Sequence, residues 1–410
     1  MGFKKDERSI TMKYSIICLL ILGLSLSCTT YYDNIDFEVQ DYHTLTIENI
    51  DTNLKVANLV LDQSEFDEMY YNYNENIEIE GFLNLYKNGE TLINNETVEV
   101  EVKGNFSSRF GLKSLGIKFV STYNNENRKL IDSDILPFHS LDRIKAFRFR
   151  NSGNDFEYTM LKDISYTKLA VDASLNLDLT YSEQTVVFVN NKFLGVMNLR
   201  TEANTNGVSR LYGVSKSDIT LAKILNGGIV EKKDGDFDRI DNFITAINNE
   251  DYDYLINEID VDNFIDYMIF ESYIGNGDWP KNNVRFFAIN DGPFRFILFD
   301  LDLVSIQDLD RSPISYINNP IKNPITDLFN VLYANASFKQ AYDMRFQSLM
   351  NSNLLSSAAF NEIVRQYKSN IETIIPTQIN KYNTPETFTD WYLNIEHLKN
   401  NFEARENYVK

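Results

Sequence analysis

The chain has 410 residues, of which 43% are hydrophobic and 13% aromatic, and this composition supports a substantial folded core. Acidic residues outnumber basic ones by 59 to 39, and the net charge of −20 disfavours nonspecific nucleic-acid binding and electrostatic docking on anionic lipid. Two cysteines, Cys18 and Cys28, and three histidines exclude a disulfide scaffold and a Cys/His zinc cluster. Chemistry after Cys28 must therefore rest on carboxylates, amides, hydroxyls, Lys and Arg.

The first 28 residues have the pattern of an export signal. Four basic residues precede a short apolar run, Ile16–Leu24, and small Ser27 stands directly before Cys28. The run is too short to span a bilayer comfortably. We expect a lipoprotein signal over residues 1–27, with Cys28 lipidated and the protein anchored in a bacterial cell envelope, facing the periplasm or the outside. An ordinary signal peptide and an uncleaved anchor are the alternatives.

Residues 28–45 are predicted to form a polar stalk, and a period of two dominates the region that follows it. Ile77–Leu85 and Thr97–Val102 alternate as strands do, and Asn88-Gly89 between them is a hairpin turn signal. The segment Lys145–Arg150 predicts another strand, and Met160–Ala173 has helical spacing. A second hairpin is predicted from the strands Thr185–Val189 and Phe193–Leu199, with Asn190-Asn191 between them.

From Asp236 the pattern becomes mainly helical. Val261–Ile269 predicts an amphipathic helix that ends near Gly275, because glycine favours the position just past a helix end. Two strands, Val284–Ile289 and Phe294–Leu303, form one hairpin within this half, and the tail from Ser337 to Tyr408 is largely helical. The prediction is an α+β domain over residues 46–410, with a strand-rich lobe at 46–200 and a mainly helical lobe at 201–410.

Two aspartates stand at the end of the predicted strand Phe294–Leu303. Alternation places Asp300 and Asp302 on one face together with Phe294, Phe296 and Leu298. Buried carboxylates are costly unless they are paired or bind a metal. We therefore expect a Mg²⁺ or Mn²⁺ site at Asp300 and Asp302, because hard oxygen ligands suit these cations.

A loop before this hairpin carries the spacing Asp-x-x-x-x-Asn at Asp278 and Asn283. Protein kinases use this spacing in their catalytic loop, where the Asp orients the acceptor hydroxyl, the Asn binds a metal, and a later Asp holds a second metal. The alternative interpretation is a solvated acidic turn.

A kinase also needs a lysine on a strand of its first lobe to hold phosphates. Lys113 shares the alternation of Leu115, Ile117 and Phe119, whereas Lys118 lies on the other face with Ser114 and Gly116. A lysine on an apolar face needs a partner, which a phosphate would supply, so Lys113 is the predicted nucleotide lysine. An edge-strand lysine that reaches solvent is the alternative. If the register is displaced by one residue, Lys118 takes the role.

Four segments in order resemble the CotH kinase family, and they cover roughly residues 55–350: Val102–Ser114, Phe147–Asp155, Val187–Arg200, and Gly275–Asn283 with Phe294–Asp302. The resemblance implies a two-lobed, atypical protein-kinase-like fold that transfers phosphate from ATP to protein. It also implies that Asp278 is the catalytic Asp and Asp300 the metal Asp, with Asn283 and Asp302 as further metal ligands.

The chain departs from the family pattern mainly on the nucleotide side. Lys103-Gly104-Asn105-Phe106 stands where the family usually has Arg-Gly-Asn-Ser, and Leu112-Lys113 stands where the family often has paired lysines. Arg109 in the first segment and Glu202, a shifted counterpart of the lysine-pairing acid, complete the predicted nucleotide site.

These observations favour an exported, lipid-anchored protein kinase that uses ATP and Mg²⁺ or Mn²⁺. Its expected substrate is Ser or Thr of an exported protein or of the chain itself, and no nucleic-acid partner is expected. The alternative is a catalytically inactive surface lipoprotein that uses the same fold as a binding or structural module. A metal-dependent phosphoesterase is a third possibility. Nucleotide binding distinguishes the first two.

Overall fold

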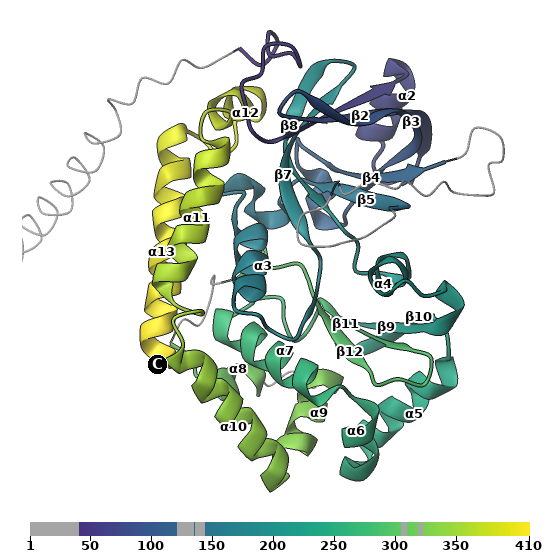
Figure 1. Ribbon diagram of the computed structural model, residues 1–410, viewed down its shortest axis with the longest axis vertical. Coiled ribbons are helices and arrows are strands. Elements are labelled where there is room, and N and C mark those ends of the chain that lie inside the picture. Colours follow the sequence, from purple (N-terminus) through teal and green to yellow (C-terminus); the bar gives the residue numbers. More distant parts are fainter. Residues whose placement is uncertain (1–40, 121–134, 136–143, 305–309, 319–322) are drawn as a thin grey trace, which may run out of the picture.

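The computed structural model describes residues 41–120, 135, 144–304, 310–318 and 323–410 (Figure 1). Cys28 and the signal segment predicted before it lie outside the described residues. Within the described ranges, no helix combines the length and apolar character that a bilayer crossing requires.

A closed seven-stranded barrel forms the first part of the molecule, with strand order β1-β2-β3-β4-β5-β8-β7 (Figure 1). The barrel closes where β1 pairs parallel with β7 and where β5 pairs antiparallel with β8. Its strands are β1 (Lys55–Leu61), β2 (Glu78–Lys87), β3 (Glu90–Lys103), β4 (Ser114–Phe119), β5 (Ala146–Arg150), β7 (Ser182–Val189) and β8 (Lys192–Arg200).

The predicted hairpins of this part are confirmed. Asn88 and Gly89 join β2 to β3 with φ of 51° and 78°, and Asn190 and Asn191 join β7 to β8 with φ of 50° and 62°. Asn and Gly are the residues that tolerate this left-handed region, and two such residues in a row match the twist of the adjoining strands.

A second, five-stranded sheet has the order β10-β9-β11-β12-β6. Its strands are β6 (Asp178–Leu179), β9 (Ile219–Leu225), β10 (Ile229–Asp234), β11 (Val284–Ile289) and β12 (Arg295–Leu298). The predicted hairpin at 284–303 is therefore part of a larger sheet. The predicted strand Phe294–Leu303 is too long, because β12 ends at Leu298 and Asp300 has a left-handed φ of 65°.

Helices make up most of the second half, which confirms the predicted α+β class with strands first and helices later. The helices are α2 (Gln63–Tyr71), α3 (Lys162–Asp172), α4 (Thr205–Tyr212), α5 (Phe237–Asn248), α6 (Tyr252–Glu258), α7 (Val261–Ile274), α8 (Pro313–Ile317), α9 (Pro324–Tyr333), α10 (Ala336–Asn351), α11 (Ser357–Ile371), α12 (Ile375–Tyr382) and α13 (Phe388–Val409). The 3₁₀ turns are η1 (Phe106–Arg109), η2 (Gly153–Glu157) and η3 (Lys216–Asp218).

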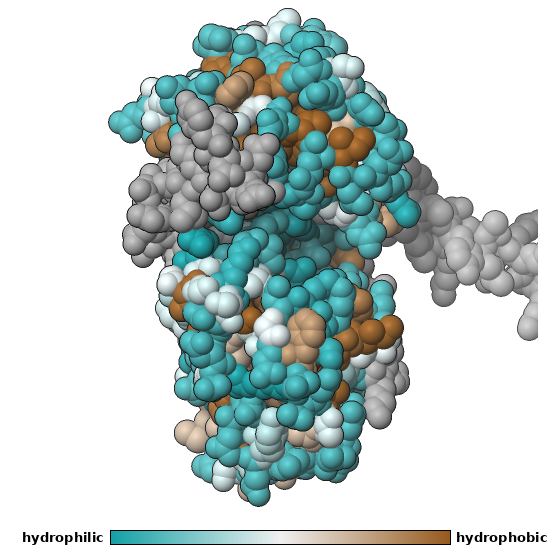
Figure 2. All heavy atoms as spheres, turned by 90° about the vertical axis from the view of Figure 1, so that its right-hand side faces the viewer, coloured by the Kyte–Doolittle hydropathy of each residue, from teal (hydrophilic) through white to brown (hydrophobic). Residues whose placement is uncertain are grey.

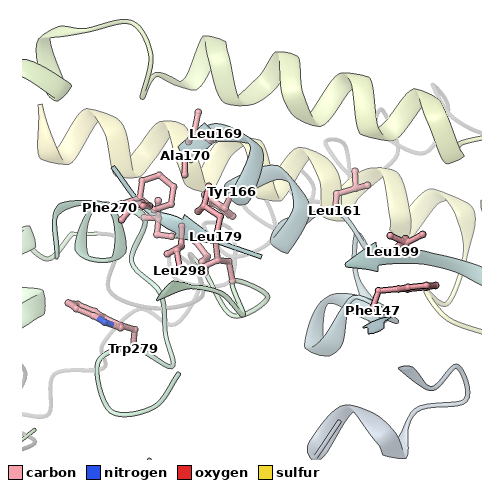
Figure 3. Close-up of a cluster of buried hydrophobic side chains, with 14 of the residues drawn as sticks. Phe147, Leu161, Tyr166, Leu169, Ala170, Leu179, Leu199, Phe270, Trp279 and Leu298 are labelled. Atoms are coloured by element: carbon pink, nitrogen blue, oxygen red, sulfur yellow. The ribbon is translucent and has the colours of Figure 1, made fainter. Parts of the chain in front are cut away.

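Helix α7 occupies the centre of the second half. Every residue from Asn263 to Ile274 is buried, so the prediction of an amphipathic helix was wrong: neighbours cover all of its sides. The predicted end is confirmed, since Gly275 caps the helix with a left-handed φ of 65°. One hydrophobic core joins the two parts of the molecule. Figure 3 shows Phe147 and Leu199 of the barrel together with Tyr166 of α3 and Phe270 of α7.

The C-terminal helices pack along one side of the molecule and contact both parts (Figure 1). Gln378 of α12 accepts a hydrogen bond from the Val196 amide of β8 at 2.5 Å, and Trp391 of α13 donates to the Thr159 carbonyl at 2.9 Å. Near the other end of α13, Arg405 donates to the Tyr273 carbonyl of α7 at 2.7 Å. Helix α13 therefore connects the barrel side to the end of α7.

Candidate active site

A cavity of about 570 Å³ lies between the barrel and the second sheet, where Figure 2 shows a hydrophilic hollow between the two halves of the molecule. Among the described residues, ten basic and four acidic side chains line it, although the whole chain is acidic. We call it the basic cavity. Its charged residues are Lys103, Lys118, Lys145, Arg148, Arg150, Arg200, Lys216, Lys223, Lys233 and Arg285, with Glu101, Glu202, Asp234 and Asp300.

The barrel wall of this cavity presents cations that are paired with carboxylates. Lys118 of β4 forms ion pairs with Glu78 and with Glu101, the latter at 2.7 Å, and Arg148 of β5 lies 3.0 Å from Glu202. Burial alone would lower the pKa of Lys118, but Glu101 and Glu78 raise it above its ordinary value. The wall therefore holds fully charged, half-buried cations at a surface open to an anionic ligand.

A second cavity of about 340 Å³ adjoins the first and shares Arg148, Arg150 and Asp300 with it. Asp278, Asn283, Asp300 and Asp302 all line this aspartate cavity. The structure thus brings together the predicted catalytic residue and the three predicted metal ligands. They come from the loop after α7 and from the loop after β12.

Asp278 lies in the loop that joins α7 to β11. Its carboxylate Oδ2 accepts a hydrogen bond from the Asn283 side-chain amide at 3.3 Å, and its backbone N–H donates to Asn276 Oδ1 at 3.3 Å. Burial raises the pKa of Asp278, and the charge of Asp300 acts in the same direction. A raised pKa makes this carboxylate a better proton acceptor than an exposed aspartate.

Asp300 and Asp302 converge on the guanidinium of Arg150 rather than lying along a continuous strand. Arg150 Nη2 forms an ion pair with Asp300 and lies 2.8 Å from Asp302 Oδ2. Burial would raise the pKa of Asp300, but Arg150 and Arg200 hold it below its ordinary value. Burial, reinforced by the charge of Asp300, raises the pKa of Asp302 to about 7.

Gly153 allows the carboxylate of Asp302 to lie close to the backbone of the segment Asn151–Asp155. The backbone N–H of Asn154 donates to Asp302 Oδ2 at 2.8 Å, and a Cβ at Gly153 would lie 1.7 Å from the same oxygen. Gly153 also has a left-handed φ of 62°. Any side chain at this position would displace Asp302, so the segment Asn151–Asp155 acts as a close-fitting cradle for that carboxylate.

A buried charge network fixes Arg150 from the other side. Asp163 of α3 pairs with Arg200 of β8, lies 3.3 Å from Arg150 Nε, and accepts the Leu301 amide at 3.0 Å. Arg150, Asp163 and Arg200 were not predicted as site residues from the sequence. A signal existed for Arg150: in the alternating run Phe147–Arg150 the phenylalanines enter the core, so the arginines must face the other way.

Lys113 does not line either cavity. Its ammonium group donates to the carbonyls of Ser108 and Phe110 at 2.7 and 3.0 Å and lies 4.3 Å from the ring centre of Tyr73. Leu115, Ile117 and Phe119 fill the barrel core, while Gly116 and Lys118 on the opposite face line the basic cavity. The structure therefore brings Lys118, and not Lys113, to the cleft.

The two remaining predicted nucleotide residues are placed differently. Glu202 lines the basic cavity; burial would raise its pKa, but Arg148 and Asn204 hold the pKa below its ordinary value. Arg109 is exposed, and its guanidinium lies 5.4 Å from the ring centre of Phe106. Arg109 itself does not line the aspartate cavity, whereas the preceding residues Gly104–Ser107 of the same segment do.

The oxygen atoms of the aspartate cavity suit a hard divalent cation. Asp300 and Asp302 supply carboxylates, and Asn283 supplies a side-chain carbonyl beside them. Across the described ranges, no group of three or more Asp, Glu, His or Cys residues is arranged to hold a metal ion. A small donor set of this kind fits Mg²⁺, which keeps several waters and takes its remaining ligands from substrate phosphates.

A strand-rich part, a helix-rich part, and a cleft with paired aspartates at its floor define a protein-kinase-like protein. Residues 100–409 match the family model described as CotH kinase protein, so the chain belongs to the CotH kinase family. Membership implies ATP and a divalent metal as cofactors.

Among solved structures, the chain is similar to one from the Shewanella oneidensis MR-1 toxin–antitoxin complex of HipA, HipB and operator DNA. The sequence identity is 16% and the TM-score 0.26. The match covers 64% of this chain and 58% of that one, so the chain spans less than two thirds of the matched protein. No curated protein sequence matches the chain.

Proposed function

We propose that this protein is an exported, lipid-anchored kinase that transfers the γ-phosphoryl group of ATP to Ser or Thr of a protein. The observation that carries the proposal is the pair of adjoining cavities: ten cations surround a space next to a floor with Asp278, Asn283, Asp300 and Asp302. Phosphoryl transfer depends mainly on positioning and charge stabilisation, which such an arrangement supplies.

In this proposal the barrel wall holds the nucleotide phosphates. Lys118, paired with Glu101, takes the role first predicted for Lys113, because its ammonium group faces the basic cavity. Arg148, held by Glu202, supplies a second donor group with the planar geometry that phosphate oxygens accept. Arg109 and Lys113 then support the loop beside the cavity rather than contacting phosphate.

Asp278 acts on the acceptor hydroxyl. The hydroxyl oxygen forms a bond to the γ-phosphorus, the bond to the β,γ-bridging oxygen breaks, ADP leaves, and the hydroxyl proton passes to Asp278. Asn283, Asp300 and Asp302 would hold the divalent cation, which when bound neutralises charge on the phosphates. Arg150, already between the two aspartates, keeps their carboxylates in place.

Export and anchoring rest on the sequence alone. The basic start, the short apolar run and Ser27-Cys28 support lipidation at Cys28. Cys28→Ala should leave the protein unlipidated, with a mass lower by the acyl groups and with loss of membrane association on fractionation. A protein that stays membrane-bound with the expected mass of the bare chain would overturn the anchor.

The test of the kinase function is transfer of label from γ-labelled ATP to protein by purified residues 29–410, with Asp278→Ala as the matched control. We expect labelled Ser or Thr with the unmutated protein and none with the variant. One observation favours the inactive module instead: Arg150 already neutralises Asp300 and Asp302. Bound metal without nucleotide binding or transfer would establish that alternative.

A further inference from the structure

Glu271 is a fully buried carboxyl group near the end of α7. Its Oε2 accepts a hydrogen bond from the Asn276 side-chain amide at 2.9 Å, while its Oε1 has no partner within the described part of the chain. A buried carboxyl group with one hydrogen bond is costly, and such groups cluster at functional sites.

Asn276 connects this carboxyl group to the loop of Asp278. It is also fully buried, and its side-chain Oδ1 accepts the backbone N–H of Asp278 at 3.3 Å. Its backbone carbonyl accepts hydrogen bonds from the Tyr316 hydroxyl at 2.5 Å and from the backbone N–H of Trp279 at 3.2 Å. Asn276 thus uses both ends of its side-chain amide: the nitrogen binds Glu271 and the oxygen binds the Asp278 backbone.

We propose that Glu271 is a positioning residue for phosphoryl transfer, which fixes the orientation of the Asn276 amide and through it the backbone of Asp278. If the hydrogen bond to Glu271 is lost, the amide can rotate and no longer presents its oxygen to the Asp278 N–H. Glu271 lines neither cavity, so it acts only through Asn276. The inference rests on the proposed kinase function, in which Asp278 receives the proton.

The protonation state of Glu271 agrees with this role. Burial raises its pKa to about 8, with Asn276 acting against the increase and the charge of Asp300 adding to it. The other titratable groups nearby are Tyr267, one turn earlier on α7, and Asp300 on the facing loop. A neutral carboxyl group at pH 7 resembles the amide of glutamine, so Glu271→Gln should preserve the relay, whereas Glu271→Leu keeps the volume and removes it.

The experiment compares four forms of the full chain, purified in detergent: unmutated, Glu271→Leu, Glu271→Gln and Asn263→Leu. Asn263 is the matched control, because it is an equally buried polar residue of α7 whose side chain bonds Asn176 and Phe296, away from the loop. We expect Glu271→Leu to lower kcat about tenfold to a hundredfold with an unchanged KM for ATP, as for a misplaced reacting group. Glu271→Gln and Asn263→Leu should keep kcat within about threefold of the unmutated value.

A second readout does not need activity. Trp279 is buried and stacks on Tyr316, and the only other tryptophan is Trp391. In a Trp391→Phe background, tryptophan fluorescence emission therefore reports only on the loop that holds Trp279 and Asp278. Glu271→Leu should move the emission of Trp279 to longer wavelength, whereas Glu271→Gln and Asn263→Leu should leave it unchanged.

Each result decides one of the two claims. Unchanged kcat and emission in Glu271→Leu overturn the positioning role, and so does a loss that Asn263→Leu reproduces. If Glu271→Leu does not fold, Asn276→Ala decides, because it removes the side-chain amide through which Glu271 acts: a kcat lowered about tenfold or more supports the role, and an unchanged kcat overturns it. If the unmutated protein transfers no phosphate, the proposed function fails and the catalytic part of the inference fails with it; the emission result then decides only whether Glu271 orders the loop of Asp278.

Discussion

The barrel wall and the floor of the cleft hold charges in two different ways. On the wall, Lys118 and Arg148 are half-buried, and each is paired with carboxylates on the same barrel or just beyond it. On the floor, Arg150 is buried between Asp163, Asp300 and Asp302, which come from α3 and from the loop after β12. The wall is formed by neighbouring segments, whereas the floor joins the two parts of the molecule.

This difference separates ligand binding from stability. A half-buried ion pair can exchange one partner for a ligand at little cost, because water compensates the released charge. A buried network has no such compensation, and removal of one member leaves unpaired charge in a medium of low polarity. Substitutions in the wall should therefore affect the ligand, and substitutions in the floor should affect the fold.

The largest effect is expected from Arg150→Met. It leaves Asp300 and Asp302 buried without their cation and should lower the free energy of unfolding by about 3–5 kcal/mol. Arg148→Met, its neighbour on the wall, should cost less than about 1 kcal/mol. Urea unfolding of both variants measures the difference. Equal losses would show that the wall and the floor are not distinct in this respect.

Asp278→Asn should give the next largest effect, and it should act on rate alone. The amide keeps the shape of the side chain but cannot receive the hydroxyl proton, so transfer should be about a hundredfold slower or more. Binding of Mg·ATP, measured by calorimetry, should stay within about twofold, because the phosphates contact the wall. A variant that transfers phosphate at the unmutated rate would remove Asp278 from the mechanism.

Lys118→Met should weaken nucleotide binding about tenfold to a hundredfold, since a charge-assisted contact contributes roughly 1.5–3 kcal/mol. The matched control is Lys113→Met, which removes a lysine of the same segment that bonds the carbonyls of Ser108 and Phe110 and lies against aromatic rings. It should leave the Kd for ATP unchanged. If Lys113→Met weakens binding and Lys118→Met does not, Lys113 is the nucleotide lysine, as predicted from the sequence, and the assignment of Lys118 is wrong.

The last prediction concerns how stability depends on pH, rather than a loss at one pH. The pKa of Glu271 is raised from 4.5 to about 8, so the folded protein retains this proton while the unfolded chain loses it. The resulting stability is complete below pH 4.5 and disappears as the pH rises through about 8. Glu271→Gln should therefore lose less stability than the unmutated protein over this range. Parallel curves of unfolding free energy against pH would contradict the assignment.

Local signals predicted much of the fold. Asn88-Gly89, Asn190-Asn191 and Gly275 define turns and a helix end through their own backbone preferences, and each lies where the sequence indicated. Barrel closure could not be predicted this way, because it depends on the pairing of β1 with β7 and of β5 with β8. The strands β9 and β10 were also missed, although Asn226-Gly227-Gly228 between them is a hairpin turn signal.

The residues of the candidate site show the same contrast between what local patterns predict and what they do not. Asp278, Asn283, Asp300 and Asp302 were found because they fall within two short segments, and the structure places them around one cavity. The network of Arg150, Asp163 and Arg200 joins β5, α3 and β8, and their meeting depends on how these elements pack, which no local pattern indicates. The assumption that Asp300 and Asp302 continue a strand was wrong, because a left-handed residue at Asp300 ends the alternation.

Helix α13 gives the cleft a fixed width. Its 22 residues make a rod of about 33 Å whose first turn bonds beside the barrel, through Trp391, and whose last turns bond the end of α7, through Arg405. Attachment at both ends should oppose hinge opening, so in the proposed function a nucleotide would enter past side chains rather than between separating lobes. A break in α13 should therefore change the rates at which a ligand enters and leaves the cleft. It would do so without altering any residue that binds the ligand.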